Sequence, residues 1–393
     1  MKKIKIVIVG GGFGGVYTAK NICEYFNEKE IEVTIINKSN YFLFTPLLHE
    51  VATGGLTPDS ITEPIHEIFR GTPVNIVEDT MLEVNYENKS VKTILNTYNY
   101  DYLVLSTGAE TNYFGTPGAK ENTFALKTLS DAISLRNHII ETCEKSIQTN
   151  NKELLTTAIV GAGPTGVELA AELQEYMQHT ICTYYKNSNF KKEDIKVKLI
   201  TATPDVISQF PIKMREVAIK ELNKKGIEVL VNKIVTKVEP NTLTFKDESV
   251  LKAHTIVWVA GVTAGKDGRI EILPSLQTNT HPEVFAIGDT AGKHPMLAQV
   301  AVQQAETVAF NITALIDKTP LQNFVFKQKG LLISLGQWYA IGNFFGFTVR
   351  GRLMWLIWRA VYLFNFLSLR KKLEILVEWT INLFYPRDIS RLG

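Results

Sequence analysis

Two copies of one glycine pattern, GxGxxG, constrain this chain more than any other feature. The first copy follows the β-branched run IKIVIVG and the second, 151 residues later, lies in TAIVGAGPTGVELAAEL; a helix-forming run follows each. The six glycines are Gly10, Gly12, Gly15, Gly161, Gly163 and Gly166. Between a strand and a helix, missing side chains let the backbone approach the pyrophosphate of a dinucleotide at the positive helix end. The sequence therefore predicts two dinucleotide-binding halves.

The repetition extends beyond the glycines. In each half, β-branched runs with a turn lead to a hydrophobic strand that ends in glycine, 98 residues from Gly10 to Gly108 and 100 residues from Gly161 to Gly261. The glycine motif, the run with a turn and the closing strand thus match in both halves. This favours an internal duplication over two unrelated α/β domains. A later strand-like run, VFAIG, ends at Asp289. That carboxylate could accept hydrogen bonds from sugar or ribityl hydroxyls, or simply form a turn.

Composition narrows the classes of function. The 393 residues are 45% hydrophobic, enough for two or three domains with sizeable cores. The cysteines, Cys23, Cys143 and Cys182, form no CxxC pair, so we expect buried thiols and no disulfide framework or metal site. Met-Lys-Lys leads directly into a strand-like run, and we expect no secretory signal or transit peptide.

The last part of the chain is basic and aromatic. From Gln328 to Gly393 there are nine Lys/Arg against three Asp/Glu, although the whole chain carries only +2. In a helical projection Arg352, Arg359 and Arg370 fall on one stripe beside a wide apolar surface with tryptophans. We interpret this as a helix that lies on a bilayer and does not cross it. The polar residues of the following run recur four apart, at Glu374, Glu378 and Asn382. A buried helix or a homodimer face is the alternative.

Four stretches give a resemblance to a known family: VGGGFGG, NYFLFTPLLHEVATGG, VGAGPTGVELAAEL and VFAIGDTAGKHPMLAQVAVQQAE. The last contains AQxAxQ, the most family-specific motif, and the tail GRLMWLIW…LRKKLEILVEW also fits. The chain resembles the two-dinucleotide flavoproteins of the glutathione-reductase class and, within them, type II NADH:quinone oxidoreductases, which are single-subunit respiratory dehydrogenases that pump no protons. The resemblance implies an α/β fold of two Rossmann-like dinucleotide-binding domains plus C-terminal amphipathic membrane-associating helices.

The resemblance also implies domains, cofactors and partners. Residues 1–115 and 266–327 would form a discontinuous FAD-binding domain, 116–265 the NADH-binding domain and 328–393 the membrane-associating region. FAD would be the cofactor, NADH the substrate, and ubiquinone or menaquinone the acceptor. The protein would bind a lipid bilayer surface peripherally, at the cytoplasmic face of the inner (plasma) membrane. A homodimer stays open, and nucleic acid is not expected as a partner.

By the same resemblance, the FAD residues would be Gly10, Gly12, Phe13, Gly14, Gly15, Asn37, Lys38, Thr45, Pro46, Leu47, Thr107, Gly108, Asp289 and Ala298. The NADH residues would be Gly161, Gly163, Pro164, Thr165, Gly166, Glu168, Thr201, Ala260 and Gly261. Asn37 stands where the family usually has an acid, but an amide still bonds a ribose hydroxyl. Thr201 also replaces an acid, and because no arginine is present instead, NADH is favoured over NADPH.

The predicted catalytic residues are Glu168, Glu172, Gln299, Gln303 and Lys372. The two glutamates are four apart and share one helix face; the resemblance suggests that Glu168 positions nicotinamide or relays protons, whereas the alternative is a solvated or ion-paired face. The two glutamines suit a quinone carbonyl. Lys372 matches a family lysine near the quinone site, or contacts lipid phosphate. None of the histidines is given a role, and His49 is expected to be structural.

Related activities remain as alternatives. A disulfide reductase or a sulfide:quinone oxidoreductase needs cysteines beside the flavin, where this chain has FLFTPLLHEVATG, so both are disfavoured. Another FAD-dependent NAD(P)H oxidase or reductase would share the nucleotide halves but not the amphipathic end. A flavoprotein binding module similar to apoptosis-inducing factor, with the tail on nucleic acid, is the second alternative.

Overall fold

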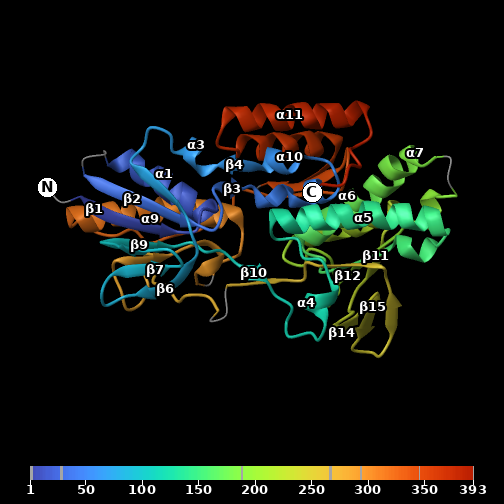
Figure 1. Ribbon diagram of the computed structural model, residues 1–393, viewed down its shortest axis with the longest axis horizontal. Helices are drawn as coiled ribbons and strands as arrows, with labels where there is room; N and C mark the ends of the chain where they lie inside the picture. Colours follow the sequence, from blue (N-terminus) through green and yellow to red (C-terminus); the bar gives the residue numbers. More distant parts are fainter. Residues whose placement is uncertain are drawn as a thin grey trace. The chain divides into compact units, whose positions relative to one another are not determined.

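The computed structural model describes residues 3–26, 30–186, 189–264, 268–292, 294–344 and 346–392. The chain divides into two compact units (Figure 1). The first unit comprises Met1–Leu43, Thr62–Glu110 and Thr263–Gln328. The second comprises Phe44–Ile61, Thr111–Val262 and Lys329–Gly393, so the C-terminal region belongs to the same unit as the second glycine-rich half.

The first unit is built on a five-stranded parallel sheet in the order β19-β9-β1-β2-β5. The strands are β1 (Ile4–Val9), β2 (Ile31–Asn37), β5 (Val74–Glu78), β9 (Tyr102–Leu105) and β19 (Val284–Ala286). Helices α1 (Phe13–Tyr25) and α9 (Ala298–Asp317) pack against each other. The central strand β1 is covered on both sides, since successive residues from Ile6 to Val9 are all buried. An antiparallel ribbon follows, formed by β6 (Met81–Asn85), β7 (Ser90–Thr93) and β8 (Thr97–Asn99).

The second unit repeats this arrangement, with a parallel sheet in the order β17-β11-β12-β13. Its strands are β11 (Thr156–Val160), β12 (Lys196–Ile200), β13 (Glu228–Leu230) and β17 (Thr255–Trp258). The long helices are α5 (Leu129–Thr149), α6 (Pro164–Glu175) and α8 (Ile212–Lys224). The antiparallel ribbon is β14 (Val235–Glu239), β15 (Thr242–Phe245) and β16 (Val250–Lys252). The matching strand orders confirm the predicted fold of two Rossmann-like halves.

The C-terminal region adds a small antiparallel sheet and two helices to the second unit. The sheet is β20 (Leu331–Ser334), β21 (Ala340–Phe344) and β22 (Phe347–Gly351), and the helices are α10 (Arg352–Phe364) and α11 (Leu369–Phe384). The helices lie side by side (Figure 1). Ser368 begins α11 by accepting a hydrogen bond from the Lys371 N–H (3.3 Å). The predicted single stripe of arginines is therefore wrong, because the chain turns between Arg359 and Arg370.

The shorter elements are β3 (Tyr41–Leu43), α2 (Leu48–Ala52), β4 (Thr62–Pro64), α3 (Ile65–Ile68), β10 (Glu110–Thr111), α4 (Ala119–Asn122), α7 (Cys182–Tyr184) and β18 (Val262–Thr263). Within the described ranges, no helix combines the length and apolar character needed to cross a membrane. The same ranges contain no group of three or more His, Cys, Asp or Glu residues placed to hold a metal ion.

Candidate functional site

The first glycine-rich turn forms an open backbone cradle between β1 and α1. Gly10 has φ +107°, and a Cβ there would lie 2.1 Å from the Ser106 carbonyl oxygen. A Cβ on Gly15 would lie 1.8 Å from the Gly10 carbonyl oxygen, so helix and strand approach closely only without side chains. A Cβ on Gly12 would meet nothing within 4 Å, so this backbone faces open space. The turn therefore has room for the pyrophosphate of a dinucleotide, and its assignment to FAD stays a prediction.

Two later strands close this cradle. The Gly108 N–H, just beyond β9, donates to Thr290 Oγ1 (2.8 Å), and the Gly288 N–H, just beyond β19, donates to Gln304 Oε1 (2.7 Å). Asp289 lies between Gly288 and Thr290, in a 3-10 turn. The sequence pattern pointed to the neighbouring residues Asp289 and Gln303. It did not identify Thr290 or the fully buried Gln304. The parallel pairing of β19 with β9 brings these two segments side by side.

Asn37 ends β2, where the sequence analysis placed the residue that bonds the ribose. Its Oδ1 accepts the Gly11 N–H (2.9 Å), and its Nδ2 donates to the Ser39 carbonyl (2.8 Å). The amide therefore holds the glycine-rich turn in place, and a contact with ribose stays a prediction. The neighbouring Lys38 is exposed.

The second glycine-rich turn has the same geometry. Gly161 has φ +112°, with a Cβ position 2.5 Å from Ala260 Cα, and a Cβ on Gly166 would lie 1.8 Å from the Gly161 carbonyl oxygen. Gly163, like Gly12 in the first half, faces open space. Thr201 pairs its hydroxyl with that of Thr203 (2.7 Å). This turn accordingly fits a second dinucleotide.

One aromatic residue beside this turn was missed. The ring of Phe114 is 64% exposed and lies against Gly261, whose added Cβ would come within 2.7 Å of it. Phe114 has a positive φ of 51°, and Asn112 Oδ1 accepts its N–H (2.8 Å). Nothing in the motif spacing pointed to it, because Phe114 lies in an irregular stretch far from the glycines in sequence.

Glu168 and Glu172 share one buried face of α6, so the alternative of a solvated face is wrong. Glu168 Oε1 accepts the Ser334 N–H (3.0 Å), and its Oε2 lies 4.0 Å from His49 Nδ1. Burial raises the pKa of Glu168 to about 7, although His49 and the Ser334 N–H oppose the shift. A carboxyl group with this pKa can hold or release a proton near neutral pH.

Glu172 differs from Glu168 because a guanidinium reaches it. Arg387 Nη2 donates to Glu172 Oε2 at 2.5 Å; Glu172 is buried, and the Arg387 side chain is 11% exposed. Burial alone would raise the pKa of Glu172, but Arg387 holds it below its usual value. The alternative of an ion-paired face is therefore correct for this one glutamate. Arg387 was missed, since 215 residues separate it from its partner.

Arg359 points into the protein and not toward the surface. Its guanidinium lies between the rings of Trp355 and Trp379, 4.2 Å from each centroid, and 4.0 Å from Glu50 Oε1. Its side chain is 13% exposed. The other Glu50 oxygen accepts the Trp379 Nε1–H (2.7 Å). The prediction that Arg359 lines a lipid-facing basic stripe is wrong; it is a caged internal cation.

Helix α11 turns its polar side to the protein and its apolar side outward. Glu378 accepts hydrogen bonds from Thr57 N (2.9 Å) and from Ser60 Oγ (2.6 Å), and Asn382 Nδ2 donates to the Gly55 carbonyl (2.6 Å). The exposed apolar residues of α10 and α11 are Leu353, Leu356, Phe364, Leu369, Leu373, Leu376, Val377, Ile381, Leu383 and Phe384. We call this set the outer apolar face. An apolar surface of this extent indicates a contact with lipid or with another protein.

The remaining predicted residues lie on separate elements. Gln299 and Gln303 are half-buried on α9, and the Gln303 amide exchanges two hydrogen bonds with the Lys327 backbone (2.9 and 3.0 Å). Lys372 is half-buried on α11, while the buried neighbour Lys371 donates to the Asp59 carbonyl (2.7 Å). In the second unit, Thr45, Pro46 and Leu47 form a 3-10 turn. The roles of these residues in binding stay predictions.

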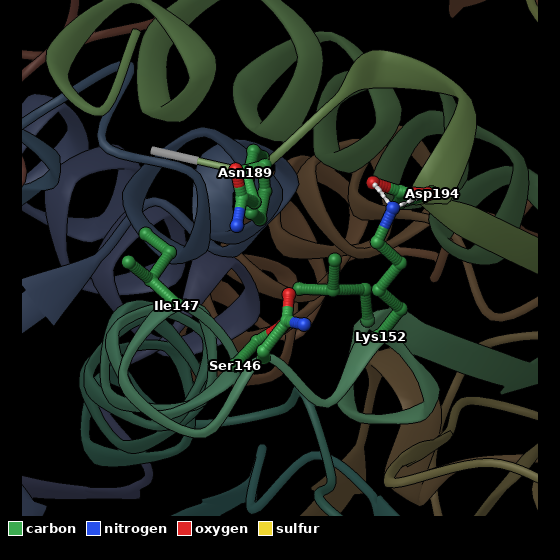
Figure 2. Close-up of a pocket in the computed structure, with 8 residues that line it drawn as sticks. Ser146, Ile147, Lys152, Asn189 and Asp194 are labelled. Carbon is green, nitrogen blue, oxygen red and sulfur yellow. Dashed lines mark hydrogen bonds and ion pairs between the residues drawn. The ribbon is translucent and has the colours of Figure 1, made fainter. Parts of the chain in front are cut away.

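A small hollow at the end of α5 is shown in Figure 2. Lys152 and Asp194 form an ion pair beside it (2.9 Å). The hollow offers about 10 Å³, roughly the room that one water molecule needs. It is therefore too small for a nucleotide or a quinone.

Comparisons with known proteins agree with this geometry. Residues 4–305 match the model of the pyridine nucleotide-disulphide oxidoreductase family, and residues 328–388 match the NDH2 C-terminal domain. The type II NADH:quinone oxidoreductase of Mycobacterium tuberculosis is 30% identical, covering 98% of this chain and 89% of the relative. That of Haemophilus influenzae is 31% identical, covering 88% and 90%. The structure of NDH2 from Plasmodium falciparum in complex with NADH superposes with a TM-score of 0.91 at 21% identity, covering 99% of this chain and 100% of that one.

Proposed function

Because the chain belongs to the type II NADH:quinone oxidoreductases of the pyridine nucleotide-disulphide oxidoreductase family, we propose that it oxidises NADH and reduces a membrane quinone. The observation that carries this proposal is one chain with two open glycine cradles and an outward-facing apolar surface. The turn at Gly10, Gly12 and Gly15 would hold FAD, and the chemistry that a bound flavin would supply there is hydride acceptance and two-electron donation. The work of the protein is to bind, to orient and to handle protons.

The two cradles divide the binding work. The turn at Gly10, Gly12 and Gly15 would hold FAD through backbone N–H groups, with Asp289 near the ribityl hydroxyls. The turn at Gly161, Gly163 and Gly166 would hold NADH, with Thr201 near its ribose. Since neither threonine of the Thr201–Thr203 pair is acidic or basic, discrimination against NADPH would be modest.

Proton transfer would be the task of helix α6. Glu168 would hold the proton that the quinone needs, because its pKa of about 7 lets both protonation states exist at neutral pH. The His49 imidazole lies beside this carboxyl group, with Nδ1 4.0 Å from Glu168 Oε2. Gln299, an uncharged amide, would donate a hydrogen bond to a quinone carbonyl without requiring a counterion.

The outer apolar face would rest on a lipid bilayer. The polar residues of α11 form hydrogen bonds within the protein. Its apolar side is exposed and available for contact with lipid. Arg352 and Arg370 are exposed beside this face and suit anionic headgroups. Because NADH is soluble in the cytoplasm, the contact belongs to the cytoplasmic face of the plasma membrane.

Steady-state assays test the activity. NADH consumption should be fast with a short-chain quinone and slow with oxygen or a ferredoxin as the acceptor. Faster reduction of oxygen would instead identify an NADH oxidase, one of the alternatives above.

Vesicle sedimentation tests the lipid contact. Leu373→Glu and Leu376→Glu together should release the protein from vesicles that contain anionic lipid. Leu95→Glu is the matched control, because Leu95 is 71% exposed in the first unit, outside this face. Unchanged sedimentation, together with a loss of dimers in light scattering, would assign the outer apolar face to a homodimer.

A further inference from the structure

The carboxylates of α6 are not equivalent, and the difference comes from the end of the chain. Three glutamates, Glu168, Glu172 and Glu175, are spaced along the helix. Glu175 pairs with Lys225, and Glu172 pairs with Arg387. Among the described residues, no lysine or arginine forms an ion pair with Glu168, whose partners are the Ser334 N–H and His49.

Arg387 is held rigidly in place. Besides Glu172, it donates through Nη1 to Thr53 Oγ1 (3.2 Å). The next residue, Asp388, accepts on its carbonyl from Arg136 Nη2 (3.1 Å) and from the Tyr176 hydroxyl (3.3 Å). These partners lie on α5 and at the C-terminal ends of α2 and α6, and they hold the guanidinium and the backbone that follows it.

The same segment is anchored at two further points. The Asn137 side chain exchanges two hydrogen bonds with the Leu392 backbone, at 2.6 and 2.8 Å. Gly54, with φ +66°, makes room for the segment, because a Cβ there would lie 2.8 Å from the Asp388 carbonyl oxygen. Residues 387–392 are therefore packed against the second unit and anchored by hydrogen bonds.

Other charged or titratable groups face the pair from the neighbouring elements. His49 and Glu50 come from α2, and Arg359 and Tyr362 come from α10. Arg359 is directed at Glu50 and caged by two tryptophans, so it acts on Glu172 only from a greater distance. Arg387 is thus the cation that touches a carboxylate of the pair.

We propose that Arg387 is a positioning residue that keeps Glu172 ionised, so that the exchangeable proton of the carboxylate pair resides on Glu168. Two buried carboxylates one helical turn apart disfavour double ionisation. The guanidinium selects which of them carries the charge, and the other carries the proton. This inference concerns the same site as the proposed function. Only the consequence for quinone reduction rests on that proposed function.

The test is a cycle of charge removals in the full-length protein with FAD. The infrared carbonyl band of protonated Glu168, identified by its loss in Glu168→Gln, is followed against pH. Glu172→Gln removes the like charge and leaves Arg387 unpaired, so the Glu168 midpoint should fall by about one to three pH units. In Arg387→Gln, Glu172 is buried without its cation, so a second acid band should appear near neutral pH.

The double variant Glu172→Gln/Arg387→Gln removes both charges and should return the Glu168 midpoint close to that of the wild type. Arg387→Lys should keep the wild-type titration. Arg391→Gln is the matched control, because Arg391 lies in the same segment and is 56% exposed, with its guanidinium 4.0 Å from Glu144. It should leave the titration unchanged.

An unchanged midpoint in Glu172→Gln would overturn the proposal, and so would the absence of a second acid band in Arg387→Gln. If Arg387→Gln does not fold, the isosteric Glu172→Gln decides alone. The infrared titration requires neither NADH nor quinone. A cycle that behaves as expected in a protein without NADH:quinone activity would therefore refute the proposed function and leave this inference standing.

Discussion

Replacing Arg359 with methionine should destabilise the second unit far more than its position in an apolar helix suggests. The guanidinium lies between two tryptophan rings and opposite Glu50, which is 2% exposed. Methionine keeps much of the apolar stem but removes the charge. Glu50 would then keep the hydrogen bond from the Trp379 Nε1–H but lose the cation that faces its other oxygen.

The expected loss follows from the two interactions that disappear. Leaving one member of a buried ion pair uncompensated costs about 3–5 kcal/mol. Each contact of the cation with an aromatic face contributes roughly 0.5–2 kcal/mol, and part of this overlaps with the first figure. We therefore expect Arg359→Met to lower the free energy of unfolding by about 3–5 kcal/mol. Adding Glu50→Gln should recover much of it, because the amide removes the unpaired charge.

Denaturant unfolding followed by tryptophan fluorescence measures this effect, since four of the five tryptophans lie at 338, 355, 358 and 379. Arg352→Met is the matched control. Arg352 is on the same helix, is exposed, and lies 5.9 Å from the Trp338 ring, so its loss should cost no more than about 1 kcal/mol. Equal, small effects of the two substitutions would refute the conclusion that Arg359 is an internal cation that stabilises the second unit.

Three further predictions concern binding and protons. Gly12→Ala should fold normally but lose FAD, because the added Cβ meets no protein atom but occupies the cradle. Gly15→Ala should lose both FAD and stability, because its Cβ would collide with the Gly10 carbonyl oxygen. Equilibrium dialysis measures FAD binding and thermal unfolding measures stability. Gln299→Leu should leave flavin reduction by NADH unchanged and slow reoxidation by quinone in stopped-flow experiments, and unchanged rates in both steps would remove this residue from the quinone site. Glu168 has a folded pKa of about 7, above its usual value, so the stability it contributes at low pH should be lost as the pH rises through about 7. Glu168→Gln should flatten that part of the stability profile, and an unaltered slope would contradict the assignment.

The double fold was predictable because glycine spacing is a local signal. A Cβ at Gly15 or Gly166 would collide with the carbonyl oxygen of Gly10 or Gly161, so the pattern encodes the strand-turn-helix geometry directly. The same locality explains why the placement of Glu168 and Glu172 on one face was correct. Residues four apart on a helix must share a side.

The parts that could not be predicted depend on contacts between distant segments. A helical projection shows that α10 and α11 have two faces, but it cannot say which face docks on the protein. In α11 the side that docks on the protein is mixed: Ile375 and Trp379 are buried there, and Glu378 and Asn382 make hydrogen bonds. For the same reason Arg359 was placed on the wrong side, and the partner of Arg387 left no trace in the sequence.

Reduction of the bound flavin followed by its reoxidation is the sharpest test of whether this chain passes electrons from NADH to a quinone. Under anaerobic conditions, NADH should bleach the absorbance of the bound flavin, and a quinone added afterwards should restore it within the turnover time. The account predicts that both steps occur in this order and without any other protein. A flavin that NADH reduces but quinone does not reoxidise would contradict it.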